Sequence, residues 1–272
     1  MAALALAATL SLLPQRAAAQ TLRGDFDMDG CVSISDVTSL INCLLTDSPG
    51  EPKPSDYDTI TVNGVPFVMV RVEGGVARRF MGDSPLTVET FSIGQTEVTQ
   101  ELWKAVMGEQ DDPPYNETGD LTLPVDCASR NDCMAFIARL NELTGLSFRL
   151  PTWDEWLYAA TGGKFTRFYQ YAGSDDIDEV AWYRGSLPGP GIPWNISPVA
   201  KKAPNELYLY DMTGNVAEWA HEWSSAGDFG DFGAVYGGRI TNVANDCIVD
   251  IAKVTALKVN VRYDFGGLRL VL

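Results

Sequence analysis

The amino-acid sequence predicts an α+β fold with much irregular structure, preceded by a small calcium-binding module. Three segments carry helix start signals followed by apolar residues at helical spacing. Two apolar runs flank an Asn-Gly pair, which is typical of a β-hairpin. The stretch 173–202 has no helical period and is rich in turn-forming residues, which indicates a long irregular region.

The first 19 residues are expected to form a signal peptide. The run 3–13 is apolar but too short to cross a bilayer, and Ala17-Ala18-Ala19 offers a small-residue cleavage site. No basic residue precedes the run, which departs from the usual leader pattern. We therefore expect export to the periplasm, the cell surface or the medium, and we expect no membrane span.

Residues 24–46 predict an EF-hand-like calcium module. Carboxylates stand at positions 1, 3, 5 and 12 of a short loop, and a glycine at position 6 allows the bend. The backbone carbonyl of position 7 can complete the coordination shell, and an apolar helical stripe follows. The expected ligands are Asp25, Asp27, Asp29, Cys31 and Asp36. The proline-rich stretch 47–58 then indicates a linker.

The main domain is expected over residues 60–272. Its first hairpin pairs 60–62 with 67–72 around Asn63-Gly64. Three helices follow, and each begins at a residue whose side chain can accept a hydrogen bond from the first turn. These capping residues are Thr99, Ser129 with Asp132, and Thr152 with Glu155.

The second of these helices is expected to be amphipathic. Cys133, Phe136, Ile137, Leu140 and Leu143 share one face, and the following glycine ends the helix. On such a face Cys133 is expected to be a small buried hydrophobe and not a nucleophile.

Composition excludes several classes of function. With 20 Lys and Arg against 36 Asp and Glu, the net charge of −16 argues against binding nucleic acid, which needs clustered cations. A single histidine, His221, cannot build a multi-histidine zinc or iron site. The five cysteines are an odd number, so they cannot all pair within the chain.

Three motifs carry a family resemblance. They are F-R-L-P-T-W-D-E-W-L-Y-A-A-T-G-G over 148–163, L-Y-L-Y-D-M-T-G-N-V-A-E-W over 207–219, and G-L-R-L-V-L over 267–272. Together they resemble the formylglycine-generating enzymes, or sulfatase-modifying factors, which implies a C-type-lectin-like fold. The module over 24–46 resembles a type I dockerin repeat, which implies a cohesin-like partner. Dockerins that bind cohesins carry two such repeats, and this chain shows one.

The resemblance also implies a calcium site in the second motif. By position, the carboxylates of Asp211 and Glu218 and the backbone carbonyls of Gly214 and Val216 match the family's ligands. Two carboxylates on either side of a Gly-Asn turn suit the oxygen-rich shell that calcium prefers.

Catalysis in the family uses two cysteines, five residues apart, that bind copper as thiolates. Here Cys247 matches the second position, but Asn242 stands at the first, and Arg239 and Ala217 replace two further family residues. Because one sulfur cannot hold Cu(I) linearly, copper is not expected and the domain is interpreted as non-catalytic. The alternative is a divergent copper-dependent oxidoreductase that converts a sulfatase cysteine to formylglycine, with Cys247 as its catalytic thiol.

The segment 240–265 departs from the family pattern, which resumes at 267. This resembles the variable proteins of diversity-generating retroelements, which use the same fold to present a ligand-binding face, and it implies a protein or glycan ligand. The expected face comprises Arg239, Thr241, Asn242, Val243, Asn245, Asp246, Tyr263, Asp264 and Phe265. The alternative is sequence drift in a paralogue that has lost its activity.

Overall fold

The computed structural model describes residues 56–77, 86–109, 119–186, 195–225, 231–249 and 254–272. The predicted signal peptide (1–19), the calcium module (24–46) with Asp25, Asp27, Asp29, Cys31 and Asp36, and the linker up to residue 55 lie outside these described residues. The chain divides into a unit of residues 1–50 and a unit of residues 51–272, and only the second is described below. No helix among the described residues is long and apolar enough to span a bilayer.

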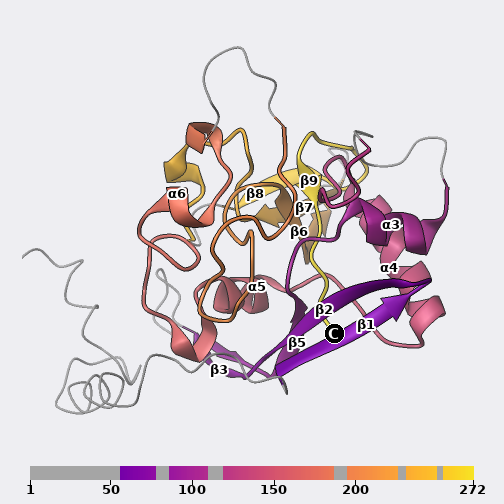
Figure 1. Ribbon diagram of the computed structural model, residues 1–272, viewed down its shortest axis with the longest axis horizontal. Coiled ribbons are helices and arrows are strands. Elements are labelled where there is room, and N and C mark those ends of the chain that lie inside the picture. Colours follow the sequence, from indigo (N-terminus) through magenta and orange to yellow (C-terminus); the bar gives the residue numbers. More distant parts are fainter. Residues whose placement is uncertain (1–55, 78–85, 110–118, 187–194, 226–230, 250–253) are drawn as a thin grey trace, which may run out of the picture. The chain divides into compact units, whose positions relative to one another are not determined.

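Two small antiparallel sheets form the N-terminal half of the domain (Figure 1). The first has the strand order β1-β2-β5, with β1 over Tyr57–Val62, β2 over Val65–Val72 and β5 over Phe91–Gly94. The second pairs β3 (Gly75–Ala77) with β4 (Leu86–Val88). The predicted hairpin is confirmed, because β1 and β2 pair around Asn63 and Gly64, whose φ angles are 48° and 87°. Strand β1 begins at Tyr57, so the strand includes the last two residues of the predicted linker.

A third sheet lies in the C-terminal half and has the order β8-β7-β6-β9. Its strands are β6 (Ala217–Ser225), β7 (Asp231–Tyr236), β8 (Thr255–Lys258) and β9 (Gly266–Gly267). Strand β9 runs parallel to β6, and the other two pairings are antiparallel. The sheet carries Ala217–Trp219, the end of the second family motif, into the interior.

The three predicted helices are confirmed, together with the side chains that cap them. They are α3 (Gln100–Met107), α4 (Arg130–Thr144) and α5 (Trp153–Ala160). Thr99 caps α3, and complete capping boxes start α4 and α5 at Ser129 and Thr152. The short helices are α6 (Ile177–Val180) and the 3-10 turns η3 (Gly163–Phe165), η4 (Arg184–Ser186) and η6 (Ala244–Asp246).

The interior contains two main apolar clusters. One joins α3 and α4 to the first sheet and to Trp219, with the Trp103 and Phe136 rings stacked at a centroid distance of 4.7 Å. The other surrounds α5. Cys133 is fully buried in the first cluster, which confirms its predicted packing role. Leu143, expected on the same buried face of α4, is instead 38 % exposed because it lies in the last turn of the helix.

The C-terminal residues 268–272 run through the middle of the domain. Their backbone exchanges hydrogen bonds with Ser92 and Gly94 of β5, with Val98 and with Arg149. Figure 1 accordingly places the C-terminus beside β1, β2 and β5. This path carries Arg269 into the interior, where its charge needs partners.

Candidate functional site

A buried ion pair links the second motif to the C-terminal one. Arg269 is 0 % exposed and Glu218 is 1 % exposed. The Arg269 Nη2 and Nε atoms donate to the Glu218 carboxylate at 2.7 and 3.0 Å, and Trp156 Nε1 donates to Glu218 Oε2 at 2.7 Å. The remaining guanidinium donors reach the backbone carbonyls of Gly94 at 2.9 Å and Tyr210 at 2.7 Å. Both charges are therefore compensated and hydrogen-bonded.

A second carboxylate, Glu97, lies in the same buried region. Its two oxygens accept from Asn215 Nδ2 at 2.8 Å and from the Val216 backbone N–H at 3.1 Å. Burial, followed by the charges of Asp211 and Glu218, raises the pKa of the Glu97 carboxyl well above its usual range. In this buried region the carboxyl groups of Glu97, Asp211 and Glu218 thus lie around the guanidinium of Arg269.

Asp211 is the carboxylate that fits a calcium ligand. It is 3 % exposed, Oδ2 accepts from the Ala200 backbone N–H at 2.7 Å, and Oδ1 is buried without a hydrogen-bond partner. Burial raises the pKa of Asp211 to about 6. An orphaned, buried carboxylate oxygen is a group that a hard cation would satisfy.

Glu218 fits less well as a calcium ligand than Asp211. It already receives four hydrogen bonds from Arg269 and Trp156, so its oxygens are occupied. The other predicted ligands are the backbone carbonyls of Gly214 and Val216, and both residues are buried, with Gly214 packed closely on Trp182. The described part of the chain contains no group of three His, Cys, Asp or Glu side chains that could hold a metal ion. The fit to calcium in this arrangement therefore depends on Asp211 and on backbone carbonyls.

Cys247, the position matched to a copper ligand, is a core residue. It is 1 % exposed and belongs to an apolar cluster with Tyr171, Ile177, Val180 and Ala181. A Cβ added to Gly238 would lie 2.7 Å from the Cys247 sulfur, so the backbone covers this thiol closely. Asn242, at the first copper position, is half-buried, and its backbone carbonyl accepts from the Arg184 N–H at 2.9 Å.

The structure brings the two segments of the predicted binding face together. Arg239 Nη1 donates to the Asp264 backbone carbonyl at 3.3 Å, which joins 239–246 to 263–265. The exposed members are Val243, Asn245, Asp246 and Asp264, and the half-buried members are Arg239, Thr241, Asn242, Tyr263 and Phe265. Among these nine, Val243 alone is an exposed large apolar residue, at 46 %. The face is therefore predominantly polar.

Three participants were absent from the residues predicted by sequence. Glu97 and Arg269 complete the buried charge cluster, and the turn at Arg184 adjoins Asn242. A signal for Arg269 exists in the sequence, because a cation between apolar Leu268 and Leu270 predicts a buried charge that needs a carboxylate. Nothing local marks the turn at Arg184, which lies 58 positions before Asn242.

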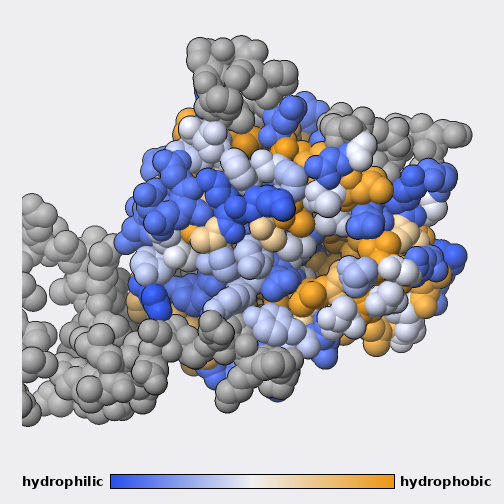
Figure 2. Space-filling view, viewed as in Figure 1, coloured by the Kyte–Doolittle hydropathy of each residue, from blue (hydrophilic) through white to orange (hydrophobic). Residues whose placement is uncertain are grey.

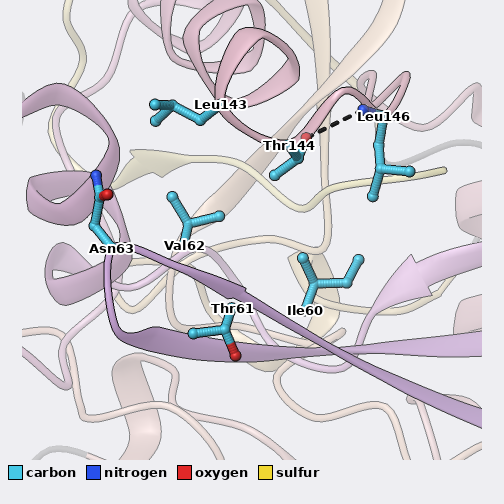
Figure 3. A pocket seen from close by; sticks show the side chains of 7 residues that line it. All are labelled: Ile60, Thr61, Val62, Asn63, Leu143, Thr144 and Leu146. Carbon is cyan, nitrogen blue, oxygen red and sulfur yellow. Dashed lines mark hydrogen bonds between the residues drawn. The ribbon is translucent and has the colours of Figure 1, made fainter.

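A separate hollow of about 330 Å³ lies between β1 and the end of α4 (Figure 3). Its walls are formed by Ile60, Thr61, Val62, Asn63, Leu143, Thr144 and Leu146. None of the predicted site residues lines it, so it is not part of the candidate site. Figure 2 shows hydrophobic residues gathered on this side of the view, where Figure 1 places α3 and α4, whereas the surface around α6 is mainly hydrophilic.

Sequence comparisons identify relatives with different activities. Chaperone protein LppX of Paenibacillus barcinonensis is 34% identical over 203 residues, which is 58% of this chain and 72% of LppX. The inactive C-alpha-formylglycine-generating enzyme 2 of Bos taurus is 32% identical over 113 residues, covering 40% of this chain and 36% of that protein. The formylglycine-generating enzyme of Streptomyces coelicolor is 32% identical over 117 residues, covering 40% and 35%. The matched regions span only about a third of these last two proteins.

Solved structures show the same fold over nearly their whole length. Treponema denticola variable protein 1 superposes with a TM-score of 0.65 and 28% identity, covering 79% of this chain and 98% of that chain. CarF superposes with a TM-score of 0.59 and 26% identity, covering 75% and 97%. The sequence also matches the family described as "Sulfatase-modifying factor enzyme 1-like domain" over residues 46–272. With motifs, fold and family match in agreement, the chain belongs to the sulfatase-modifying factor enzyme 1-like family.

Proposed function

We propose that this protein is a non-catalytic member of its family that binds a protein or glycan ligand through its C-terminal loops. The proposal depends on the two residues, Asn242 and Cys247, that stand where the family's copper-binding cysteines are expected. Asn242 offers an amide where the family pair needs a thiolate, and Cys247 is 1 % exposed inside an apolar cluster. A hard amide beside a buried thiol does not form the two-sulfur site that Cu(I) needs.

The binding half of the proposal rests on the face itself. The segments 239–246 and 263–265 meet at the Arg239–Asp264 contact and present polar side chains on a rigid scaffold. Loops carried by such a scaffold change specificity at low cost to the fold. The similarity to a structure named a variable protein and to a relative named inactive supports the same reading.

The second candidate function is oxidation of a sulfatase cysteine to formylglycine. It is favoured by the thiol of Cys247 at a matching position and by the similarity to a formylglycine-generating enzyme. A peptide containing C-x-P-x-R would be incubated with the purified full-length chain, Cu(I) and dioxygen, and then weighed by mass spectrometry. We expect an unchanged peptide mass. Conversion of the thiol to an aldehyde by the wild-type chain, lost in Cys247→Ser, would overturn the non-catalytic proposal.

We propose further that calcium stabilises the domain at Asp211, with backbone carbonyls such as those of Gly214 and Val216 as additional ligands. The proposal is supported by the buried, unpartnered Oδ1 of Asp211 and by the excess of carboxyl groups over guanidinium in this region. Glu218 contributes as the counterion of Arg269 in this arrangement. A bound divalent cation would relieve the cost of burying the Asp211 charge.

Export of the protein remains a proposal that rests on the leader predicted over residues 1–19. Expression of the full-length chain in a bacterium, followed by N-terminal sequencing of the product, tests it. Cleavage after Ala19 is expected, and an intact Met1 in cytoplasmic material would count against export.

A further inference from the structure

Strand β1 is the free edge of the first sheet. At the other edge of this sheet, the backbone N–H groups of Ser92 and Gly94 in β5 donate to the C-terminal segment at 3.0 and 2.8 Å, so that edge is covered. Among the described strands, β1 pairs with β2 alone, and its register runs without a shift. The strand has no lysine, proline or bulge, and these are features that usually protect an exposed edge from further pairing.

Two residues of β1 direct their backbone hydrogen-bonding groups outward. The Val62–Val65 pair closes the two-residue turn, and hydrogen-bonded pairs alternate along an antiparallel ladder, so every second residue back from Val62 bonds to β2. Pro66 has no N–H to donate and stands opposite Thr61, which agrees with this alternation. The N–H and C=O groups of Thr59 and Thr61 therefore point away from the sheet. Both residues are exposed, and within the described part of the chain no hydrogen bond reaches these groups.

The hollow of about 330 Å³ between β1 and the end of α4 lies along this edge. Figure 3 shows Ile60 and Val62 pointing toward the side where Leu143 and Leu146 form the facing wall, while Thr61 points away. The two leucines are 38 and 39 % exposed, although both are large apolar side chains. None of the seven lining residues is charged. A strand placed beside β1 would therefore direct every second side chain toward an uncharged hollow walled by leucines.

The charge beside the hollow indicates which partner fits this edge. Asp58 is exposed and shares the face of β1 that carries Ile60 and Val62, since alternate residues of a strand point to one side. A strand running antiparallel to β1 would meet these residues in the order Val62, Ile60, Asp58. Opposite charges across a strand pair stabilise it, so a cation suits the last of these positions. A second copy of this chain fits less well, because two chains of net charge −16 repel each other.

We propose that the β1 edge is a docking site for an extended segment of another protein that carries apolar residues at its first and third positions and a lysine or arginine at its fifth. The segment adds to the first sheet as an antiparallel strand. Its second and fourth residues exchange backbone hydrogen bonds with Thr61 and Thr59, and its first and third side chains enter the hollow. No residue of this site belongs to the face over 239–246 and 263–265, so the site goes beyond the ligand binding proposed above.

The probes are synthetic fluorescent peptides with this pattern, in which threonine fills the alternate positions and the apolar positions vary among valine, leucine and phenylalanine. Fluorescence anisotropy measures their affinity for the full-length chain, and amide hydrogen exchange is followed at Thr59 and Thr61. N-methylation of the second or fourth peptide residue removes a hydrogen bond to β1, and we expect it to weaken binding roughly tenfold. N-methylation of the third residue leaves these bonds in place and is the matched control.

Variants of the chain test the edge and the hollow separately. Thr61→Pro removes an outward N–H that the sheet does not use, and proline is tolerated at such an edge position. Leu146→Asn removes part of the apolar wall. Met134→Asn is the matched control, because Met134 is also 39 % exposed but does not line the hollow. We expect the first two variants to weaken binding about tenfold and the control to stay within about twofold, with melting curves to establish that each is folded.

A charge exchange tests the register of the added strand. Asp58→Lys is expected to weaken the peptide with lysine at position five by roughly threefold, and glutamate at that position is expected to restore the affinity. Affinity that ignores both the exchanged charge and the position of the N-methyl group would overturn strand pairing at this edge.

Two further results would overturn the inference. One is that the patterned peptides bind no more tightly than scrambled ones. The other is that the Thr59 and Thr61 amides are already protected without peptide, because the edge is then covered within the chain or by a second copy, which sedimentation distinguishes. Val243→Asp alters the C-terminal face and is expected to leave peptide affinity unchanged, so failure here is distinguishable from failure of the function proposed above.

Discussion

Arg269 carries its positive charge with none of its surface exposed, and every group around it is arranged to meet that charge. Glu218 supplies the opposite charge, and the carbonyls of Gly94 and Tyr210 accept the remaining donors. A buried pair of this kind contributes little when it is compared with a well-packed apolar pair. Removing one partner is costly, because the other charge then stays buried and unpaired.

We therefore expect Arg269→Met to lower the free energy of unfolding by roughly 3–5 kcal/mol. Glu218→Leu combined with Arg269→Met should recover part of this loss, since the paired change leaves no buried charge behind. The matched control is Arg139→Met on the surface of α4, expected within about 0.5 kcal/mol of the wild type. Urea unfolding measures all three. A loss for Arg269→Met no larger than that of the control would show that the pair does not stabilise the interior.

At the level of elements, α5 combines a helix cap with an ion pair. Glu155 accepts from the Thr152 N–H at 2.8 Å and from two guanidinium nitrogens of Arg149 at 2.5 and 2.6 Å. Burial opposes ionisation of Glu155, but the hydrogen bonds from Arg149 and Thr152 outweigh it and lower the pKa of this carboxyl. A carboxyl whose pKa is lower in the folded state stabilises the fold above its unfolded pKa of 4.5.

The contribution of Glu155 should therefore be complete near neutral pH, begin to fall near pH 4.5 and be lost as the pH falls through the lowered folded-state pKa. Glu155→Gln keeps the capping box but removes the charge. Near pH 7 we expect the variant to be less stable by roughly 1 kcal/mol, and near pH 3.5 we expect a smaller difference, because the unfolded chain takes up a proton at Glu155 before the folded protein does. Denaturant unfolding at both pH values measures this. An equal difference at both would show that the carboxylate charge is not responsible.

The same element shows what the sequence could predict. Thr152 and Glu155 stand three residues apart, so the start of α5 is encoded locally, as are the start of α4 and the Asn63-Gly64 hairpin. The buried charge cluster is not local: Glu97 reaches Asn215 across 118 positions, and Arg269 reaches Gly94 across 175. Periodicity and capping rules contain no information on such contacts. Family motifs supplied Asp211 and Glu218, but only the fold showed that Arg269 occupies the Glu218 carboxylate.

The same distinction between local and distant signals separates the predicted binding face from the turn at Arg184, which was not predicted. The segment 239–246 was marked by its departure from the family pattern, whereas Arg184 joins it through a backbone hydrogen bond that depends on the path of 173–186. No sequence pattern marked Gly185 either, although its missing Cβ lets the turn pack on Tyr183.

We expect Gly185→Ala to lower the free energy of unfolding by about 1–3 kcal/mol through overpacking. Gly119→Ala is an unsuitable control because φ is +87° there. Gly74→Ala is expected to be more destabilising, because its added Cβ would meet backbone atoms at 2.5 Å, which cannot move aside as a side chain can. The melting temperature of Gly185→Ala should therefore lie between those of the wild type and Gly74→Ala.

For the whole molecule, the excess of negative charge is the main electrostatic feature that affects its stability. The chain has a formal net charge of −16, and its interior places the Glu97, Asp211 and Glu218 carboxyls around one guanidinium. Self-repulsion on this scale opposes the compact state. A cation that binds only the native protein would stabilise it by RT ln(1 + [L]/Kd), about 2.7 kcal/mol at a hundred times Kd.

Asp211→Asn tests whether calcium stabilises the domain at Asp211. The asparagine keeps an acceptor for the Ala200 N–H and tolerates the left-handed backbone at this position, where φ is 57°, but it carries no charge. In EDTA the variant should melt at the same temperature as the wild type or higher, because the wild type then buries an unpaired carboxylate. In excess calcium the order should reverse, with the wild type higher by several degrees.

Calcium bound by the predicted N-terminal module must be separated from this effect. Asp27→Asn combined with Asp29→Asn removes two module ligands and leaves Asp211 intact. The calcium-dependent shift of the main melting transition should persist in this double variant and shrink in Asp211→Asn, as measured by differential scanning calorimetry of the full chain. If the shift instead disappears with the module variant and survives in Asp211→Asn, calcium acts through the loop of residues 25–36. Asp211 would then be a buried acid that the fold tolerates without a cation.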